Sequence, residues 1–251
     1  MKRLIIIPFV CAAIAAFGMV LDASSAAMFY RGVLIAAAFV TALSAFITTS
    51  KFVFGDKLYA SWLFVGIGYT LSTIRYSLRL AAMIRGGGDL LPRTALDAML
   101  VLQNVAIAVA LLMFVLAWRS TGLASGGWGL IAVGILIALL IGGYALYKGY
   151  ETRSADAVLL ISTLGDVVGI ALIVPLAISA RALRGGLLMH TWLYLALCEF
   201  FWMLYDIWLA VRERLGVSPR AGTGVEQMIR VAAIMFAFIA TVAQRRAAPR
   251  S

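Results

Sequence analysis

Four charged side chains inside long apolar stretches are the residues of this sequence best placed to do chemistry. Arg75 and Arg79 lie four residues apart in TLSTIRYSLRL, and Glu199 and Asp206 lie seven residues apart in LCEFFWMLYD. These spacings put each pair on one face of a helix. Because a charge in an apolar environment is energetically costly, such residues face the interior of a helical bundle and pair there or line a wet cavity. The sequence therefore predicts that the two pairs meet between helices.

Two roles for these charges remain open at this point. In the first, Asp206 forms an ion pair with Arg75 or Arg79, and the pair serves only to hold two helices together, since breaking a buried pair is costly. In the second, one arginine is free to bind a carboxylate or phosphate ligand through two parallel hydrogen bonds. Trp202 lies beside the carboxylates in the sequence and is predicted to line the same pocket.

Two further carboxylates occupy the middle of apolar stretches. Asp166 stands between Gly165 and Gly169 in ISTLGDVVG. Small residues let helices approach closely, so Asp166 either hydrogen-bonds a neighbouring backbone or binds a proton. Glu199 lies near the centre of its stretch, where burial disfavours a charge, and it is a candidate for sensing or carrying protons.

The predicted site consists of polar and aromatic residues within apolar stretches. The predicted ligand-binding residues are Arg75, Arg79, Asp166, Glu199, Trp202 and Asp206, and the predicted supporting polar residues are Asp97, Gln103 and Asn104. The single histidine, His190, excludes a haem held by two histidines and a histidine metal cluster. We therefore expect no cofactor and no metal. The sequence also lacks HExxH, GxSxG and P-loop patterns, which favours a role other than catalysis.

Composition identifies the elements that must position these residues. Hydrophobic residues make up 64% of the 251 residues and charged residues 13%, whereas an average soluble domain has about 25% charged residues. A helix needs about 20 mainly apolar residues to cross a bilayer, and such windows recur along the whole chain. We predict an all-α integral membrane protein, a single polytopic domain over residues 1–251 with a bundle of eight transmembrane helices. These helices are predicted at 4–21, 28–49, 58–84, 94–118, 128–147, 155–180, 187–212 and 224–243.

The charge distribution predicts how the bundle is oriented. The formal net charge of +10 is carried mostly by Lys and Arg at helix ends, where they meet lipid headgroups, so the lipid bilayer rather than nucleic acid is the expected partner. Ten of them lie on the face that holds the N-terminus and seven on the opposite face. This bias and the even number of helices favour a bacterial inner membrane protein with both termini in the cytoplasm.

The first apolar stretch allows two interpretations. Lys2 and Arg3 precede it, and the small residues of LDASSAAM follow it, as in a signal peptide. Because the stretch is longer than a typical signal core, we expect an uncleaved first helix. The alternative is a cleaved signal and seven helices.

The position of each polar residue along its predicted helix places most of them far from the face that holds the termini. Each helical residue advances about 1.5 Å, so the direction of a helix fixes the depth of its residues. On this basis Arg75, Arg79 and Asp206 lie in the outer half of the bundle, as do Glu226 and Arg230. We expect a polar pocket that opens to the outside and is closed on the inner side by apolar packing.

The tryptophans support two more expectations. Trp62, Trp118, Trp128 and Trp192 fall near the ends of predicted spans and are predicted to lie in the aromatic belt at the membrane surface. The stretches SWLFVGIGYT and TWLYLALCEF align at an offset of 130 residues, with Trp62 matched to Trp192. The two stretches lie in the third and the seventh predicted helix, four helices apart. A duplication would therefore produce a parallel four-helix repeat.

One segment suggests a family. Residues 154–209 contain STLGDVVGIALIVPLAISARALRGG followed by TWLYLALCEFFWMLYDIW. This segment, under a quarter of the chain, resembles the last helices of the membrane sensor regions of bacterial histidine kinases and diguanylate cyclases. In those regions a helix with a Gly-Asp precedes a short basic turn and a helix that ends beside an Asp. The matching residues here are Gly165, Asp166, Arg181, Arg184 and Asp206.

The resemblance implies a sensor role and a signalling partner. Those sensor proteins continue into a kinase or cyclase domain, whereas this sequence ends at Ser251, so we expect any signal to pass to a separate protein. We predict a sensor-like module that binds a small or lipid-like ligand in the outward-facing pocket. The alternatives are a small secondary transporter with Glu199 or Asp166 as its proton site, and a structural subunit of a larger membrane complex.

Overall fold

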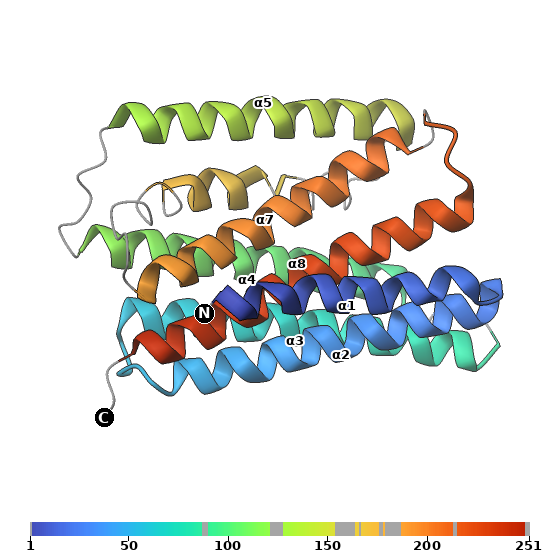
Figure 1. Ribbon diagram of the computed structural model, residues 1–251, viewed down its shortest axis with the longest axis horizontal. Coiled ribbons are helices and arrows are strands. Elements are labelled where there is room, and N and C mark those ends of the chain that lie inside the picture. Colours follow the sequence, from blue (N-terminus) through green and yellow to red (C-terminus); the bar gives the residue numbers. More distant parts are fainter. Residues whose placement is uncertain are drawn as a thin grey trace.

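The chain folds into a bundle of helices that run along one long axis (Figure 1). The computed structural model describes residues 2–86, 90–120, 128–153, 164–165, 167–175, 178, 187–212 and 215–248. The α-helices are α1 (Ile6–Ala16), α2 (Ala23–Thr49), α3 (Lys57–Ile84), α4 (Arg93–Arg119), α5 (Trp128–Arg153), α7 (Leu187–Val211) and α8 (Pro219–Ala247). Short 3-10 turns, Lys2–Ile5 and Phe17–Val20, flank α1, and residues 167–175 are helical. The predicted all-α fold is confirmed.

Four of these helices are long and apolar enough to cross a membrane. They are Ala23–Thr49, Arg93–Arg119, Leu188–Leu209 and Pro219–Ala247. Ile6–Val20 and Ala132–Tyr144 are shorter apolar helices. α3 is as long as the four, but its two arginines and several hydroxyl side chains make it less apolar. The structure thus supports a multi-pass helical membrane protein, while the passage of all eight predicted helices through the bilayer stays a prediction.

Two helices begin earlier than hydropathy predicts, because polar caps extend them. α2 begins at Ala23, where the Asp22 carboxylate accepts hydrogen bonds from the backbone N–H groups of Ser24 at 3.1 Å and Ser25 at 3.0 Å. These bonds satisfy N–H groups that have no partner within the helix. At α8, the Ser218 hydroxyl accepts a hydrogen bond from the backbone of Ala221, and a proline occupies the first helical position.

Aromatic side chains fill the core on the side of the bundle that holds the start of α3. Trp62, Phe114 and Trp192 come from α3, α4 and α7, and Phe114 makes edge-to-face contacts with both tryptophans at ring distances of 4.9 and 5.4 Å. The belt prediction is therefore wrong for Trp62 and Trp192, and also for Trp118, since all three are buried. Trp128 lies outside the described side chains. Packing against Phe114 stabilises both indoles more than an exposed position at the lipid surface would.

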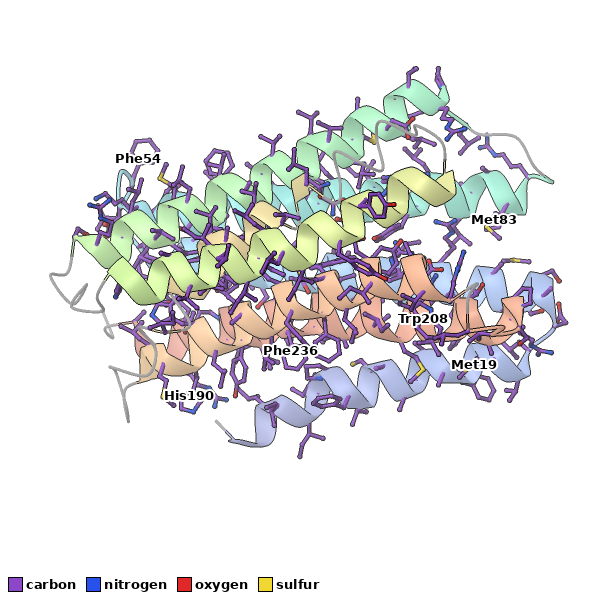
Figure 2. The ribbon with its side chains drawn as sticks, turned by 90° about the horizontal axis from the view of Figure 1, so that it is seen from above. Met19, Phe54, Met83, His190, Trp208 and Phe236 are labelled. Carbon is purple, nitrogen blue, oxygen red and sulfur yellow. The ribbon has the colours of Figure 1, made fainter. Side chains whose placement is uncertain are left out.

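α1 is an integral part of the bundle. It packs against α8, and the Phe9 ring makes edge-to-face contacts with Phe236 and Phe201 at 5.8 and 6.4 Å. The start of α1 and the end of α8 lie toward the same end of the bundle, which we call the end of the termini (Figure 1). Figure 2 shows Phe54 and His190 toward that end and Met19, Met83 and Trp208 toward the other, with Phe236 between them.

A row of hydrogen bonds joins α2 to α8. The Thr41 and Thr48 hydroxyls donate to carbonyls of their own helix, those of Ala37 at 2.8 Å and Ser44 at 2.7 Å. Each hydroxyl also lies 3.3 Å from a carbonyl oxygen of α8, that of Ile234 or Thr241, respectively. Ser44 hydrogen-bonds the Thr241 hydroxyl and accepts from Arg245 Nη2 at 3.0 Å. Hydroxyl pairs of this kind link helices where no water competes for the bonds. We call this row the α2–α8 seam.

Two glycines of α5 let it approach the helical stretch 167–175. A Cβ added at Gly134 or Gly142 would collide with the side chain of Val174 or Val167, respectively. The neighbouring Gly143 faces open space. α5 forms one edge of the bundle (Figure 1) and exposes most of its described aliphatic side chains.

Candidate functional site

The helices enclose a cavity of about 360 Å³ that gathers most of the predicted site. Side chains of α2, α3, α4, α7 and α8 line it, together with Gly165 and Gly169. The predicted ligand-binding and supporting residues on its wall are Arg75, Arg79, Gln103, Asn104, Glu199, Trp202 and Asp206. Its volume falls in the range of about 300–1,000 Å³ that is typical of small-molecule sites.

Apart from Glu199, which lies at the middle of α7, the charged residues of the cavity lie in the half of the bundle away from the termini. Arg75 and Arg79 precede Met83, which also lines the cavity, and Asp206 precedes Trp208. Figure 2 places Met83 and Trp208 toward the end opposite the termini. The structure does not identify the side of the membrane on which this end lies, so its outward orientation stays a prediction.

One arginine of the cavity, Arg230, has several compensating neighbours, although its Nε has no hydrogen-bond partner. Arg230 of α8 donates to the Tyr76 hydroxyl at 2.8 Å and to Gln227 Oε1 at 3.2 Å. Its guanidinium carbon lies 5.3 Å from the ring centre of Tyr76 and 5.5 Å from that of Tyr205, and it pairs with Glu226 at 3.7 Å. Cation–π contacts and an adjacent carboxylate compensate its charge.

Glu226 also pairs with a second arginine. Arg212, in the turn after α7, donates from Nη1 to Glu226 Oε2 at 3.0 Å. One carboxylate thus neutralises cations from two segments, and it fixes the end of α7 to the first turns of α8. We call Glu226, Arg212 and Arg230 the Glu226 hub.

Three other arginines of the cavity have no such compensation among the described residues. Arg31 of α2 and Arg75 and Arg79 of α3 take part in none of the ion pairs or hydrogen bonds that join described side chains. Arg75 is only 9% exposed, and its Nε has no hydrogen-bond partner. Arg31, Arg75, Arg79 and Arg230 line the same cavity, where like charges repel one another. The cavity therefore holds positive charges that face one another.

Glu199 occupies a different part of the cavity wall. It is 4% exposed and lies at the middle of α7. A Cβ at Gly169 would collide with its carboxylate, so glycine is required for the carboxylate to lie against the helical stretch 167–175. Its chain neighbour Cys198 lies 3.6 Å from the Tyr69 hydroxyl. No described arginine contacts Glu199 closely enough to pair with it.

The expected ion pair between α3 and α7 is not among those that join described residues. Asp206 lines the cavity but pairs with neither Arg75 nor Arg79 in the described ion pairs, and Glu226 is the carboxylate that binds arginine instead. Asp97 lies apart from the cavity and pairs with Arg93 on its own helix at 3.8 Å. Asp166, like the Arg181 and Arg184 of the proposed family motif, lies outside the described residues.

Sequence reasoning missed several cavity residues. Arg31 was not singled out, although an arginine within an apolar stretch is the signal that identified Arg75. Glu226 and Arg230 were assigned to the outer half but not to the site. Tyr76 and Tyr205 carried no signal, because a tyrosine within a span is unremarkable until a cation is found over its ring.

Comparison of the chain with known protein families, with curated proteins and with solved structures finds no match. The site must therefore be interpreted from its own geometry. Among the described residues, no three His, Cys, Asp or Glu side chains are grouped so as to hold a metal ion. The arrangement offers instead a polar cavity with uncompensated guanidinium groups in one part and a buried carboxyl group in another.

Proposed function

We propose that this chain is a multi-pass membrane protein that binds a small or lipid-like ligand in its polar cavity and acts as a sensor-like module. The proposal includes an inner-membrane location with both termini in the cytoplasm and the cavity facing outward. The charge bias of the sequence and the position of the cavity, away from the end that holds the termini, support this orientation.

The unpaired guanidinium of Arg75 is the observation that carries the proposal. A structural arginine in the interior of a bundle is normally compensated, as Arg230 is by Glu226 and two tyrosines. Arg75 is as well buried, yet it has no such partner and lines a cavity. Retaining a destabilising polar group at such a position is typical of a binding site, where function outweighs stability.

A secondary transporter is the second candidate, and Glu199 favours it. A carboxyl group at the middle of a span, in the wall of the same cavity and without a cationic partner among the described residues, is suited to binding a proton. Proton binding there would couple to the movement of a ligand only if the cavity opened to each side in turn. A sensor needs no such alternation.

Ligand-dependent stability and flux distinguish the two candidates. Purified protein is heated in the presence of small acids, amines, sugars and phosphate esters, and the same compounds are loaded into proteoliposomes for uptake assays. A sensor shows a raised unfolding temperature without flux, because a ligand stabilises the state that binds it. A transporter shows flux that is lost in Glu199→Gln.

A variant with a filled cavity provides the control. Ser72 is 2% exposed and lines the cavity, so Ser72→Leu places an apolar side chain in the space that a ligand would occupy. Stabilisation that persists in Ser72→Leu would come from another surface and would contradict the proposal.

A further inference from the structure

We propose that the chemical group recognised in the cavity is an oxyanion, a carboxylate or phosphate, and that Arg31, Arg75 and Arg79 bind it. This inference rests on the proposed function and names the class of its ligand. The three residues come from two helices that pack against each other, α2 and α3, and they line one cavity.

The lining of the cavity carries more positive than negative side chains. Four arginines and three acidic residues line it. Glu226 is already shared between Arg230 and Arg212, the second of which lies outside the cavity. Glu199 is next to Gly169 and Cys198 and makes none of the described ion pairs. Asp206, the third acidic residue of the lining, pairs with none of the four arginines of the cavity in the described ion pairs. The positive part of the cavity thus exceeds the negative charge that the described residues direct toward it.

The arginines that line the cavity repel each other. Arg31, Arg75, Arg79 and Arg230 line the same cavity, and the described ion pairs of Glu226 are with Arg230 and Arg212. Repulsion between like charges is strong where little water screens it. A bound anion would relieve it for all three uncompensated arginines at once, and no neutral ligand would.

The shape of the guanidinium group favours an oxyanion as the ligand. Arginine presents its N–H donors in a planar fork that matches the two oxygens of a carboxylate or phosphate. Arg75 takes part in none of the hydrogen bonds or ion pairs that join described side chains, although it is nine-tenths buried and lines the cavity, so these side chains leave its fork unoccupied. Arg230 differs in its terminal nitrogens, which donate to Gln227 and Tyr76 and pair with Glu226, although its Nε, like that of Arg75, has no hydrogen-bond partner.

The same oxyanion chemistry occurs in a soluble solute and in a lipid headgroup, and the test separates these sources. The protein is placed in phosphatidylcholine nanodiscs, and unfolding is followed by the fluorescence of its six tryptophans. The soluble probes are inorganic phosphate, glycerol 3-phosphate and acetate at constant ionic strength, with glycerol and acetamide as uncharged counterparts. The lipid probe is a nanodisc of equal parts phosphatidylcholine and phosphatidic acid.

Variants with a matched control localise the effect. Arg75→Gln removes the buried guanidinium, and Arg79→Gln, at a less buried position, serves if the first variant does not fold. Arg93→Gln is the control, because that side chain is 76% exposed and lies outside the cavity. Losing charge-assisted hydrogen bonds should raise the half-saturating probe concentration about tenfold or more in the cavity variants. Arg93→Gln should leave it unchanged.

The possible results of these stabilisation measurements lead to different conclusions about the ligand. Stabilisation by the soluble anions that is lost in Arg75→Gln supports the inference with a solute as ligand, and stabilisation by phosphatidic acid alone, lost in the same variant, supports it with a headgroup. If glycerol or acetamide stabilises the protein as well as its charged counterpart, and only Ser72→Leu abolishes this, the oxyanion inference is overturned while the cavity remains a binding site. If no probe stabilises the protein, both proposals fail.

Discussion

Replacing Glu226 by glutamine removes one negative charge from between two arginines while preserving the shape of the side chain. The hub joins Arg212 at 3.0 Å and Arg230 at 3.7 Å to the two oxygens of this carboxylate. The amide of the variant keeps one acceptor oxygen but loses the charge, and its NH₂ group would face a guanidinium. We therefore expect Glu226→Gln to destabilise the protein by separating the end of α7 from α8.

The expected loss of stability in Glu226→Gln depends on how far the three side chains of the hub are buried. Leaving one partner of a fully buried ion pair uncompensated costs about 3–5 kcal/mol, whereas hydrogen bonds between membrane helices average about 0.6 kcal/mol. The side chains of Glu226 and Arg230 are 15% and 14% exposed, and that of Arg212 is 30% exposed. Partial access of water reduces the first figure, so we expect a loss of about 2–3 kcal/mol in the free energy of unfolding.

Reversible unfolding in mixed micelles, by titration with sodium dodecyl sulfate, measures this loss. Asp97→Asn is the matched control, because its partner Arg93 is 76% exposed at a separation of 3.8 Å. Such a surface pair contributes at most about 1 kcal/mol. Equal effects of Glu226→Gln and Asp97→Asn would refute the reasoning, since they would mean that solvent screens the hub as effectively as it screens a surface pair.

Three other perturbations test the fold. Gly142→Val should destabilise the protein by about 1–3 kcal/mol through overpacking, while Gly143→Val, which faces open space, should change the denaturant midpoint little. Phe114→Ala should cost about 3–5 kcal/mol by leaving a cavity between two tryptophans, whereas Phe54→Ala at an 86% exposed position should be nearly neutral. Hydrogen bonds from two serines hold the pKa of Asp22 below its usual range. The stabilisation by this cap should therefore be complete above the unfolded value of about 3.9 and decline as the pH falls further, to be measured by unfolding at decreasing pH against Asp22→Asn.

Apolar runs predicted the helices well, because a span is defined by its own composition. The predicted 58–84, 94–118 and 187–212 lie within one residue of α3, α4 and α7 at each end. Helix starts were less predictable, since Asp22 and Ser218 extend α2 and α8 through capping bonds that hydropathy does not include.

The sequence predicted part of the cavity wall, but it predicted neither Arg31, Glu226 and Arg230 as members of the site nor the pairing of its charges. A charge within an apolar stretch must face the interior, and this reasoning alone brought Arg75, Arg79, Glu199 and Asp206 to one cavity. The choice of partner depends on how the helices pack against one another, which one sequence does not encode locally. The pair expected between Asp206 and an arginine of α3 is therefore not among the described ion pairs, and Glu226 instead joins the end of α7 to α8.

The same limit explains the tryptophans. Proximity to the end of an apolar stretch predicted a membrane-surface position for Trp62 and Trp192, yet both rings contact Phe114 in the core. The end of a hydropathy window is not the end of the packed bundle when neighbouring helices cover it.

The α2–α8 seam determines which parts of the molecule can respond to a ligand. Its hydrogen bonds join α2 to α8 at several positions, and these two helices carry Arg31 and Arg230. Among the described side chains, α3 is hydrogen-bonded to this pair of helices through the Tyr76 hydroxyl, which accepts from Arg230 at 2.8 Å, and α3 carries Arg75 and Arg79. A ligand bound by Arg75 and Arg79 would therefore act on this contact between α3 and α8, so spectroscopic probes should be paired between α3 and α8 rather than between α2 and α8.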